Sequence, residues 1–144
     1  MDFPTAVRTC LSKYATFEGR ARRAEFWWFL LFGWLISIAA GFLDWMLFGR
    51  AIMGPDMMDS GMTMMVWRSP IQNLVGLALI LPGLAVAVRR LHDTDRSGWW
   101  WWLCLIPLIG VIILIVWYAT RGTQGPNRFG PDPIGPDSYS SASA

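Results

Sequence analysis

The chain places its only histidine beside an aspartate, inside a short run rich in charge. Three arginines, two aspartates and His92 stand between Arg89 and Arg96. A histidine oriented by a carboxylate such as Asp93 can act as a general base or a metal ligand. A metal phosphohydrolase would need further histidines. A nucleophilic site would need an activated nucleophile, and no nucleophile-elbow pattern surrounds Ser97.

The sequence also contains no Gly-rich phosphate loop, no HExxH and no CxxC motif. We therefore favour a non-enzymatic protein with no catalytic residue, metal site or cofactor. An enzyme that acts on lipid is the lesser alternative, and it would depend on His92.

A network of ion pairs accounts better for these charges. The planar guanidinium of arginine suits both a carboxylate and a phosphate. We expect the side chains to pair with one another and pin the helices, or to bind anionic lipid or a protein. The expected network comprises Arg20, Arg22, Arg23, Glu25, Arg89, Arg90, His92, Asp93, Asp95, Arg96 and Ser97.

The composition indicates a membrane protein. Of 144 residues, 54% are hydrophobic and ten are tryptophan, more apolar surface than one small soluble core can bury. The net charge of +2 is too small to indicate nucleic-acid binding. Cys10 and Cys104 lie in different segments and form neither a metal pair nor a disulfide framework, so both are expected to be free thiols.

Three apolar runs predict transmembrane helices over about residues 26–48, 71–88 and 99–118. The first spans about 34 Å as a helix, and Pro82 and Pro107 should kink the other two. The expected fold is an all-α integral membrane protein with three transmembrane helices in one domain over residues 1–133. Residues 134–144 are expected to form a disordered tail.

The first residues predict an amphipathic helix that lies at the membrane interface or packs on the helix bundle, over about residues 3–17 and stopped by Gly19. Its apolar positions recur at helical spacing. These positions are Phe3, Val7, Cys10, Leu11, Tyr14 and Phe17.

The basic residues indicate the orientation in the membrane. With three crossings, one side carries eight: Arg8, Lys13, Arg20, Arg22, Arg23, Arg89, Arg90 and Arg96. The other side carries four: Arg50, Arg68, Arg121 and Arg128. The positive-inside rule then predicts a multi-pass protein of the bacterial inner membrane with a cytoplasmic N-terminus and an external tail. A third segment that re-enters and returns would instead move the tail inside.

Small residues recur at four-residue spacing in the first apolar run, at Gly33, Ser37 and Gly41. This spacing predicts a helix-packing face, which a homo-oligomer or a membrane-protein partner could use. Asp44 is expected to be an interfacial carboxylate in reach of water, with a buried functional carboxylate as the alternative. A subunit of a small-solute transporter or channel is the competing function, and it requires Asp44 or His92 to face water.

Methionines crowd the loop between the first two apolar runs. Thioethers are soft ligands suited to Cu(I), but methionine also fills apolar gaps, and the loop has no histidine or cysteine. Metal binding is therefore the lesser alternative here. The methionines of this loop are Met53, Met57, Met58, Met62, Met64 and Met65, and Met46 lies just before it.

Three blocks occur in order: residues 19–27 (GRARRAEFW), 89–100 (RRLHDTDRSGWW) and 125–133 (GPNRFGPDP). Over about residues 10–133 the chain resembles a bacterial inner-membrane family, domain of unknown function 805, the YhaH-like proteins. The resemblance implies a small integral inner-membrane protein of undetermined activity. It implies no catalytic residue, and neither the methionine-rich loop nor the serine-rich end belongs to its pattern.

Overall fold

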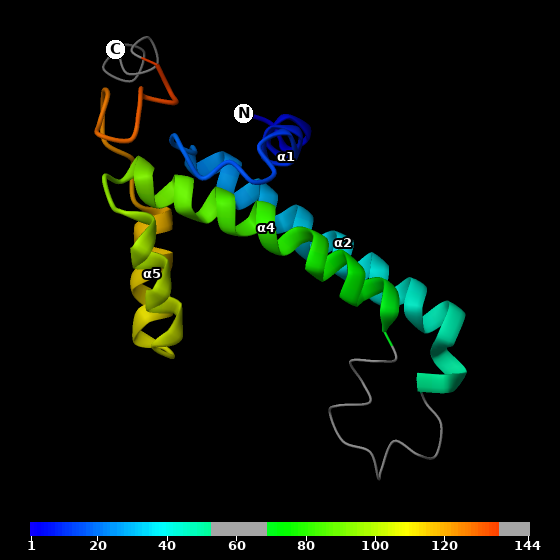
Figure 1. Cartoon of the computed structure of the whole chain (residues 1–144). Helices are drawn as coiled ribbons and strands as arrows, with labels where there is room; N and C mark the ends of the chain where they lie inside the picture. Colours follow the sequence, from blue (N-terminus) through cyan, green and yellow to red (C-terminus); the bar gives the residue numbers. More distant parts are fainter. Residues whose placement is uncertain (53–68, 136–144) are drawn as a thin grey trace. The chain divides into compact units, whose positions relative to one another are not determined.

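The computed structural model describes residues 1–52 and 69–135, in which every regular element is a helix (Figure 1). The order is α1 (Phe3–Ser12), α2 (Arg23–Ile52), α4 (Pro70–Asp93), the 3-10 helix η2 (Gly98–Leu105) and α5 (Ile109–Ala119). The all-helical prediction is confirmed. The six methionines of the predicted loop, at positions 53–65, lie outside the described residues, and so do residues 136–144 of the predicted tail. Met46 lies in α2.

The chain forms two compact units. One contains Met1–Phe29 and the described residues from Pro82 onward, and the other contains Leu30–Leu81. The boundary crosses α4 at Pro82, where the helix is continuous.

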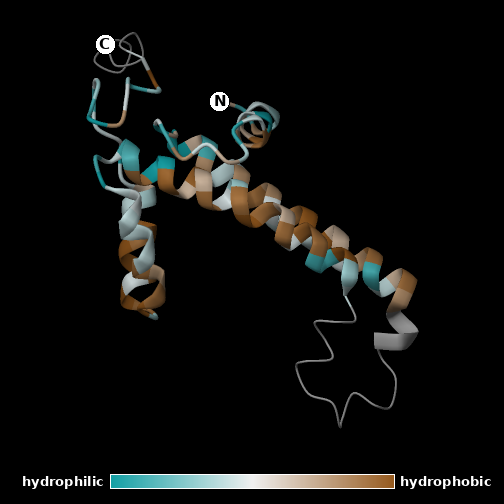
Figure 2. Cartoon of the chain, in the orientation of Figure 1, coloured by the Kyte–Doolittle hydropathy of each residue, from teal (hydrophilic) through white to brown (hydrophobic). Residues whose placement is uncertain are grey.

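Among the described residues, two helices are long and apolar enough to cross a bilayer: Arg23–Phe48, with 26 residues, and Pro70–Asp93, with 24. Even 24 helical residues extend about 36 Å, more than the hydrocarbon core of about 30 Å. Figure 2 shows apolar residues along most of both helices. Trp34 and Phe42 are 64% and 60% exposed, as expected of side chains that face lipid.

The apolar run over residues 99–118, predicted as a transmembrane helix kinked at Pro107, forms two separate helices. η2 and α5 are separate, and each extends about 16 Å, half the thickness of a bilayer core. Trp100 and Trp117 touch edge to face, with ring centroids 5.6 Å apart. A Cβ on Gly110 would overlap the Leu103 carbonyl. The chain therefore runs out and back as a helical hairpin, the 98–119 hairpin.

The reversal has a local cause. Pro107 has no backbone N–H, and its ring disfavours helical backbone at the preceding residue. Leu108 then adopts a positive φ of 64°. A helix cannot continue through this pair of residues, so the apolar run folds back on itself.

Two other boundaries differ from prediction. α1 ends at Ser12 and not near residue 17, and Gly19, with φ of +84°, lies in the link to α2. α4 continues to Asp93, so the residues from Arg89 to Asp93 form its last turns and not an interhelical turn. Ser97 caps the next helix, because its hydroxyl accepts from the Trp99 N–H at 3.4 Å.

In the unit Leu30–Leu81, the predicted small-residue face lies against α4 of the same chain. A Cβ on Gly33 would lie 3.9 Å from Leu79 Cδ1, and one on Gly41 would lie 3.3 Å from Gln72 Oε1. The Ser37 hydroxyl donates to the Gly33 carbonyl at 2.7 Å. Because Gly33 and Gly41 have no side chains, α4 can approach α2 closely at this face.

Asp44 is buried, with 1% of its surface exposed, so the prediction of a water-facing carboxylate was wrong. Its two oxygens accept from the backbone N–H groups of Ile71 at 3.1 Å and Gln72 at 2.8 Å. The first N–H groups of a helix have no partner within the helix, and the positive end of the helix dipole favours an anion there. Asp44 therefore caps α4 from another helix.

We expect Asp44→Ala to destabilise this unit by about 1–3 kcal/mol, because the backbone N–H groups of Ile71 and Gln72 lose their acceptor. Asp44→Asn keeps one acceptor oxygen and should cost less. The measurement is unfolding in mixed micelles with increasing sodium dodecyl sulfate. Leu43→Ala, at an exposed neighbouring position, is the control. Equal stabilities of the alanine variant and the control would contradict the cap.

Candidate functional site

The segment after α5 returns to the end of α4. The Thr123 N–H donates to the Asp93 carbonyl at 2.8 Å, and Asn127 Nδ2 donates to the His92 carbonyl at 2.9 Å. The link before α2 joins the same place, where the Ala21 N–H donates to the Arg89 carbonyl at 3.0 Å. We call residues 19–25, 89–97 and 118–135 together the polar cap. Figure 1 shows its last segment beside the end of α4.

The Asp93 carboxylate lies at the centre of the polar cap and is 2% exposed. One oxygen accepts from Arg20 Nε at 2.9 Å, and the other accepts from Arg90 Nη1. Arg20 also donates to the carbonyls of Gly125 at 2.6 Å and Thr123 at 2.5 Å. Both arginines are fully engaged by groups of the same chain.

Arg90 ties the 98–119 hairpin to this carboxylate. Its Nε donates to the Tyr118 carbonyl at 3.1 Å, and its Nη2 donates to the Thr120 carbonyl. These acceptors lie at the C-terminal end of α5, where unpaired carbonyls and the helix dipole favour a cation. The end of α5 therefore packs against the end of α4.

A second buried ion pair lies under α1. Arg89 Nη1 donates to Glu25 Oε1 at 2.7 Å, and the Arg89 side chain is wholly buried. Cys10 Sγ lies 3.7 Å from the same oxygen. Burial, reinforced by the Glu25 charge, raises the pKa of Cys10 to about 12, so the thiol is neutral. Within the described residues, Arg89 Nε and Nη2 have no hydrogen-bond partner.

The other predicted network residues surround this core. Arg22 Nε donates to the Pro133 carbonyl at 2.5 Å, and Arg23, which is exposed, donates to the Ala119 carbonyl at 3.3 Å. Asp95 pairs at 3.2 Å with Arg128 at the surface. The Arg96 guanidinium lies 4.4 Å from the ring centroid of Trp117.

His92 is not paired with Asp93. Its ring stacks on Phe129, with centroids 4.0 Å apart, and its Nδ1 lies 3.2 Å from the Gly19 carbonyl. Because arginines hold the carboxylate of Asp93, a His–Asp couple for acid–base catalysis is not formed. No group of three or more His, Cys, Asp or Glu side chains suited to a metal occurs in the part of the chain that the structure describes.

All eleven predicted network residues belong to one unit, and five form its buried core. Sequence reasoning missed the acceptors after α5, which are mostly backbone carbonyls. It treated residues from Arg121 on as a loop leading to a tail. The third block of the resemblance, residues 125–133, was the available signal that this segment has a fixed partner.

We expect Asp93→Asn to destabilise the protein by about 3–5 kcal/mol, because two buried guanidinium groups lose their counter-charge. Asp95→Asn removes the same charge from an exposed pair and should cost about 1 kcal/mol or less. Detergent-solubilised protein would be unfolded by heat, with limited proteolysis after residue 120 as a local readout. Similar losses in both variants would contradict the central role of Asp93.

Comparison with known proteins now places the chain. The model of a family described as Protein of unknown function (DUF805) matches residues 14–131. The chain is 43% identical over 123 residues to the inner membrane protein YhaH of Escherichia coli K12, covering 85% of this chain and 91% of the relative. It is 39% identical over 123 residues to the inner membrane protein YhaI of the same strain, with 85% and 90% covered. No solved structure matches.

The matched region contains α2, α4, the 98–119 hairpin and the polar cap up to residue 131. The family predicted from the three blocks is therefore confirmed, and the chain belongs to the DUF805 family of proteins of unknown function.

Proposed function

We propose that this protein is a non-enzymatic, membrane-organising protein of the bacterial inner membrane. It crosses the bilayer with α2 and α4 and keeps its polar cap at the cytoplasmic face, where the cap contacts anionic lipid. The observation that carries the proposal is that the basic side chains of this unit fall into two groups, one buried and one exposed. The cap's buried arginines bind groups of the same chain, whereas other cations of this unit are exposed.

The hairpin supports the proposed membrane topology. Because residues 98–119 run out and back, Arg121 and Arg128 lie in the polar cap with the link before α2. Of the twelve basic residues, the proposed cytoplasmic side then carries ten, and Arg50 and Arg68 remain on the other. This asymmetry is stronger than the eight to four of three crossings, and it favours two crossings with both described ends inside.

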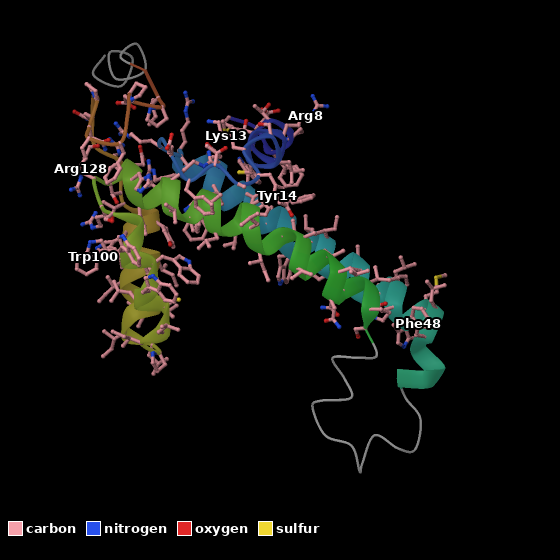
Figure 3. The ribbon with its side chains drawn as sticks, in the orientation of Figure 1. Arg8, Lys13, Tyr14, Phe48, Trp100 and Arg128 are labelled. Atoms are coloured by element: carbon pink, nitrogen blue, oxygen red, sulfur yellow. The ribbon has the colours of Figure 1, made fainter. Side chains whose placement is uncertain are left out.

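The N-terminal segment suits the membrane interface. Leu11, Tyr14 and Phe17 are 41%, 39% and 37% exposed, while Arg8 and Lys13 are also exposed. Figure 3 shows the side chains of Arg8, on α1, and of Tyr14, just past its end, pointing in different directions. Apolar side chains on one side and cations on another are typical of a helix lying in the headgroup region.

The exposed cations provide the contact with anionic headgroups. Each Lys or Arg near an anionic surface contributes about 1 kcal/mol, so a few suffice for a measurable lipid preference. In the described part of the chain Arg121 forms no ion pair, whereas Arg128 is paired with Asp95. The proposed contacts are Arg8, Lys13, Arg23 and Arg121.

The transporter alternative loses one of its two candidate residues, because Asp44 is buried and caps α4. It would then depend on His92. A homo-oligomer or a membrane-protein partner is compatible with the proposal. The small-residue face is occupied by α4 of the same chain, so such a partner would use the exposed side of α2 near Trp34, Ile38 and Phe42.

The topology can be tested by labelling in intact cells. Gln124→Cys, in the polar cap, should react with a membrane-permeant maleimide but not with an impermeant one. Ser60→Cys, in the loop between α2 and α4, should react with both. The unsubstituted protein reports the background from Cys10 and Cys104. Labelling of Gln124→Cys by the impermeant reagent would contradict two crossings.

Lipid contact can be tested by native mass spectrometry of protein released from nanodiscs that contain phosphatidylcholine and phosphatidylglycerol. We expect preferential retention of phosphatidylglycerol. The combined substitution Arg8→Gln, Lys13→Gln and Arg121→Gln should reduce this preference at least about fivefold, the effect of one cation of about 1 kcal/mol. Arg128→Gln is the matched control, with a smaller effect because Arg128 is paired. A preference unchanged by the triple substitution would refute the proposed contact.

A further inference from the structure

An open pocket of about 420 Å³ lies where the link after α1 meets the start of η2. All its lining residues belong to the unit that contains the polar cap. Neither the ion pairs of the cap nor the proposed anionic contacts involve it. The pocket is lined by Phe17, His92, Ser97, Gly98, Trp99 and Trp102.

His92 presents a hydrogen-bond acceptor toward this pocket. Its Nδ1 lies 3.2 Å from the Gly19 carbonyl, which can only accept, so Nδ1 carries the proton. In the neutral ring Nε2 is then an acceptor. Stacking on Phe129 holds the ring in place, and no hydrogen bond to Nε2 occurs among the residues described.

Glycine at position 98 keeps this acceptor open. A Cβ on Gly98 would lie 3.6 Å from His92 Nε2 and 2.7 Å from Val88 Cγ1. A side chain there would cover Nε2 as well as collide with α4. The missing side chain thus leaves Nε2 at the pocket wall.

The rest of the lining selects a cation. No arginine or lysine lines the pocket, so an anion would find little compensation. Phe17, Trp99 and Trp102 offer aromatic faces, which attract ammonium groups. A primary ammonium also has N–H donors for Nε2, which a quaternary ammonium lacks. The Ser97 hydroxyl remains able to donate to a phosphate ester oxygen beside it.

The neighbouring surface suits acyl chains. η2 leads from the pocket into the turn of the 98–119 hairpin, where Leu105 and Leu108 are 70% and 77% exposed. A ligand with an ammonium group in the pocket and hydrocarbon along η2 would match both surfaces.

We propose that this pocket binds the ammonium headgroup of an aminophospholipid, of which phosphatidylethanolamine is the simplest. This inference rests on the proposed function for the position of the pocket at the bilayer surface. It adds a specific headgroup site to the general attraction for anionic lipid.

The test is native mass spectrometry of the full chain from nanodiscs in which phosphatidylethanolamine, phosphatidylcholine and phosphatidylglycerol compete. We expect phosphatidylethanolamine to be retained over phosphatidylcholine by about fivefold, the effect of one hydrogen bond of ordinary strength. His92→Phe keeps a ring that can stack on Phe129 but removes the acceptor, and it should bring this ratio close to one. The retention of phosphatidylglycerol over phosphatidylcholine should not change.

A second pair of variants keeps the test valid if His92→Phe fails to fold. Trp102→Leu should weaken binding of phosphatidylethanolamine and of phosphatidylcholine, because both have ammonium headgroups. Trp34→Leu, an equally large change at an exposed tryptophan of the other unit, should weaken neither. An ethanolamine preference that survives His92→Phe in folded protein would overturn the proposal. So would soluble phosphoethanolamine binding as tightly as the lipid. Loss of the phosphatidylglycerol preference alone would refute the anionic contact and leave the pocket standing.

Discussion

The carboxylate of Asp93 is the interaction on which the polar cap depends. It holds Arg20 from the link before α2 and Arg90 from its own helix, and the backbone carbonyl of Asp93 receives the segment after α5. The three buried arginines of the cap face only two buried carboxylates, Asp93 and Glu25. Backbone carbonyls supply the remaining negative potential, including those at the end of α5. Charge balance in the cap is therefore achieved partly by helix ends.

This arrangement explains how the apolar helix α4 can contain two adjacent arginines, Arg89 and Arg90, near its C-terminal end. Removing a guanidinium from water costs several kcal/mol unless an acceptor replaces each lost hydration contact. Arg90 is satisfied by Asp93 and by the end of α5, and Arg89 by Glu25 in part. The neutral thiol of Cys10 packs against the Glu25 carboxylate and adds no charge there. The cap can therefore remain compact while its buried arginines keep acceptors within the chain.

The sequence predicts the helices of this protein better than their connections. Hydropathy and helical spacing are local properties, so the two long helices and the helical nature of the first residues could be predicted. The pairing of Arg20 with Asp93 joins residues 73 positions apart, and an arginine fork suits a lipid phosphate equally well. Acceptors such as the Thr123 carbonyl have no side-chain signature. When residues 99–118 are counted as a full membrane crossing, Arg121 and Arg128 fall on the opposite side of the membrane from the first two segments of the polar cap. Pro107 was the sequence signal that this segment turns back.

The closure of the cap by residues 123–125 has a consequence for biosynthesis. During translation Arg20 leaves the ribosome long before Thr123 and Gly125, whose carbonyls complete its hydrogen bonds. α2 and α4 can enter the membrane while this arginine is still hydrated or held by lipid phosphate. The cap can thus be completed only after residues 123–125 have been made. A chain truncated after α5 would keep its membrane helices but expose unsatisfied guanidinium groups, a feature by which quality-control proteases could distinguish incomplete copies.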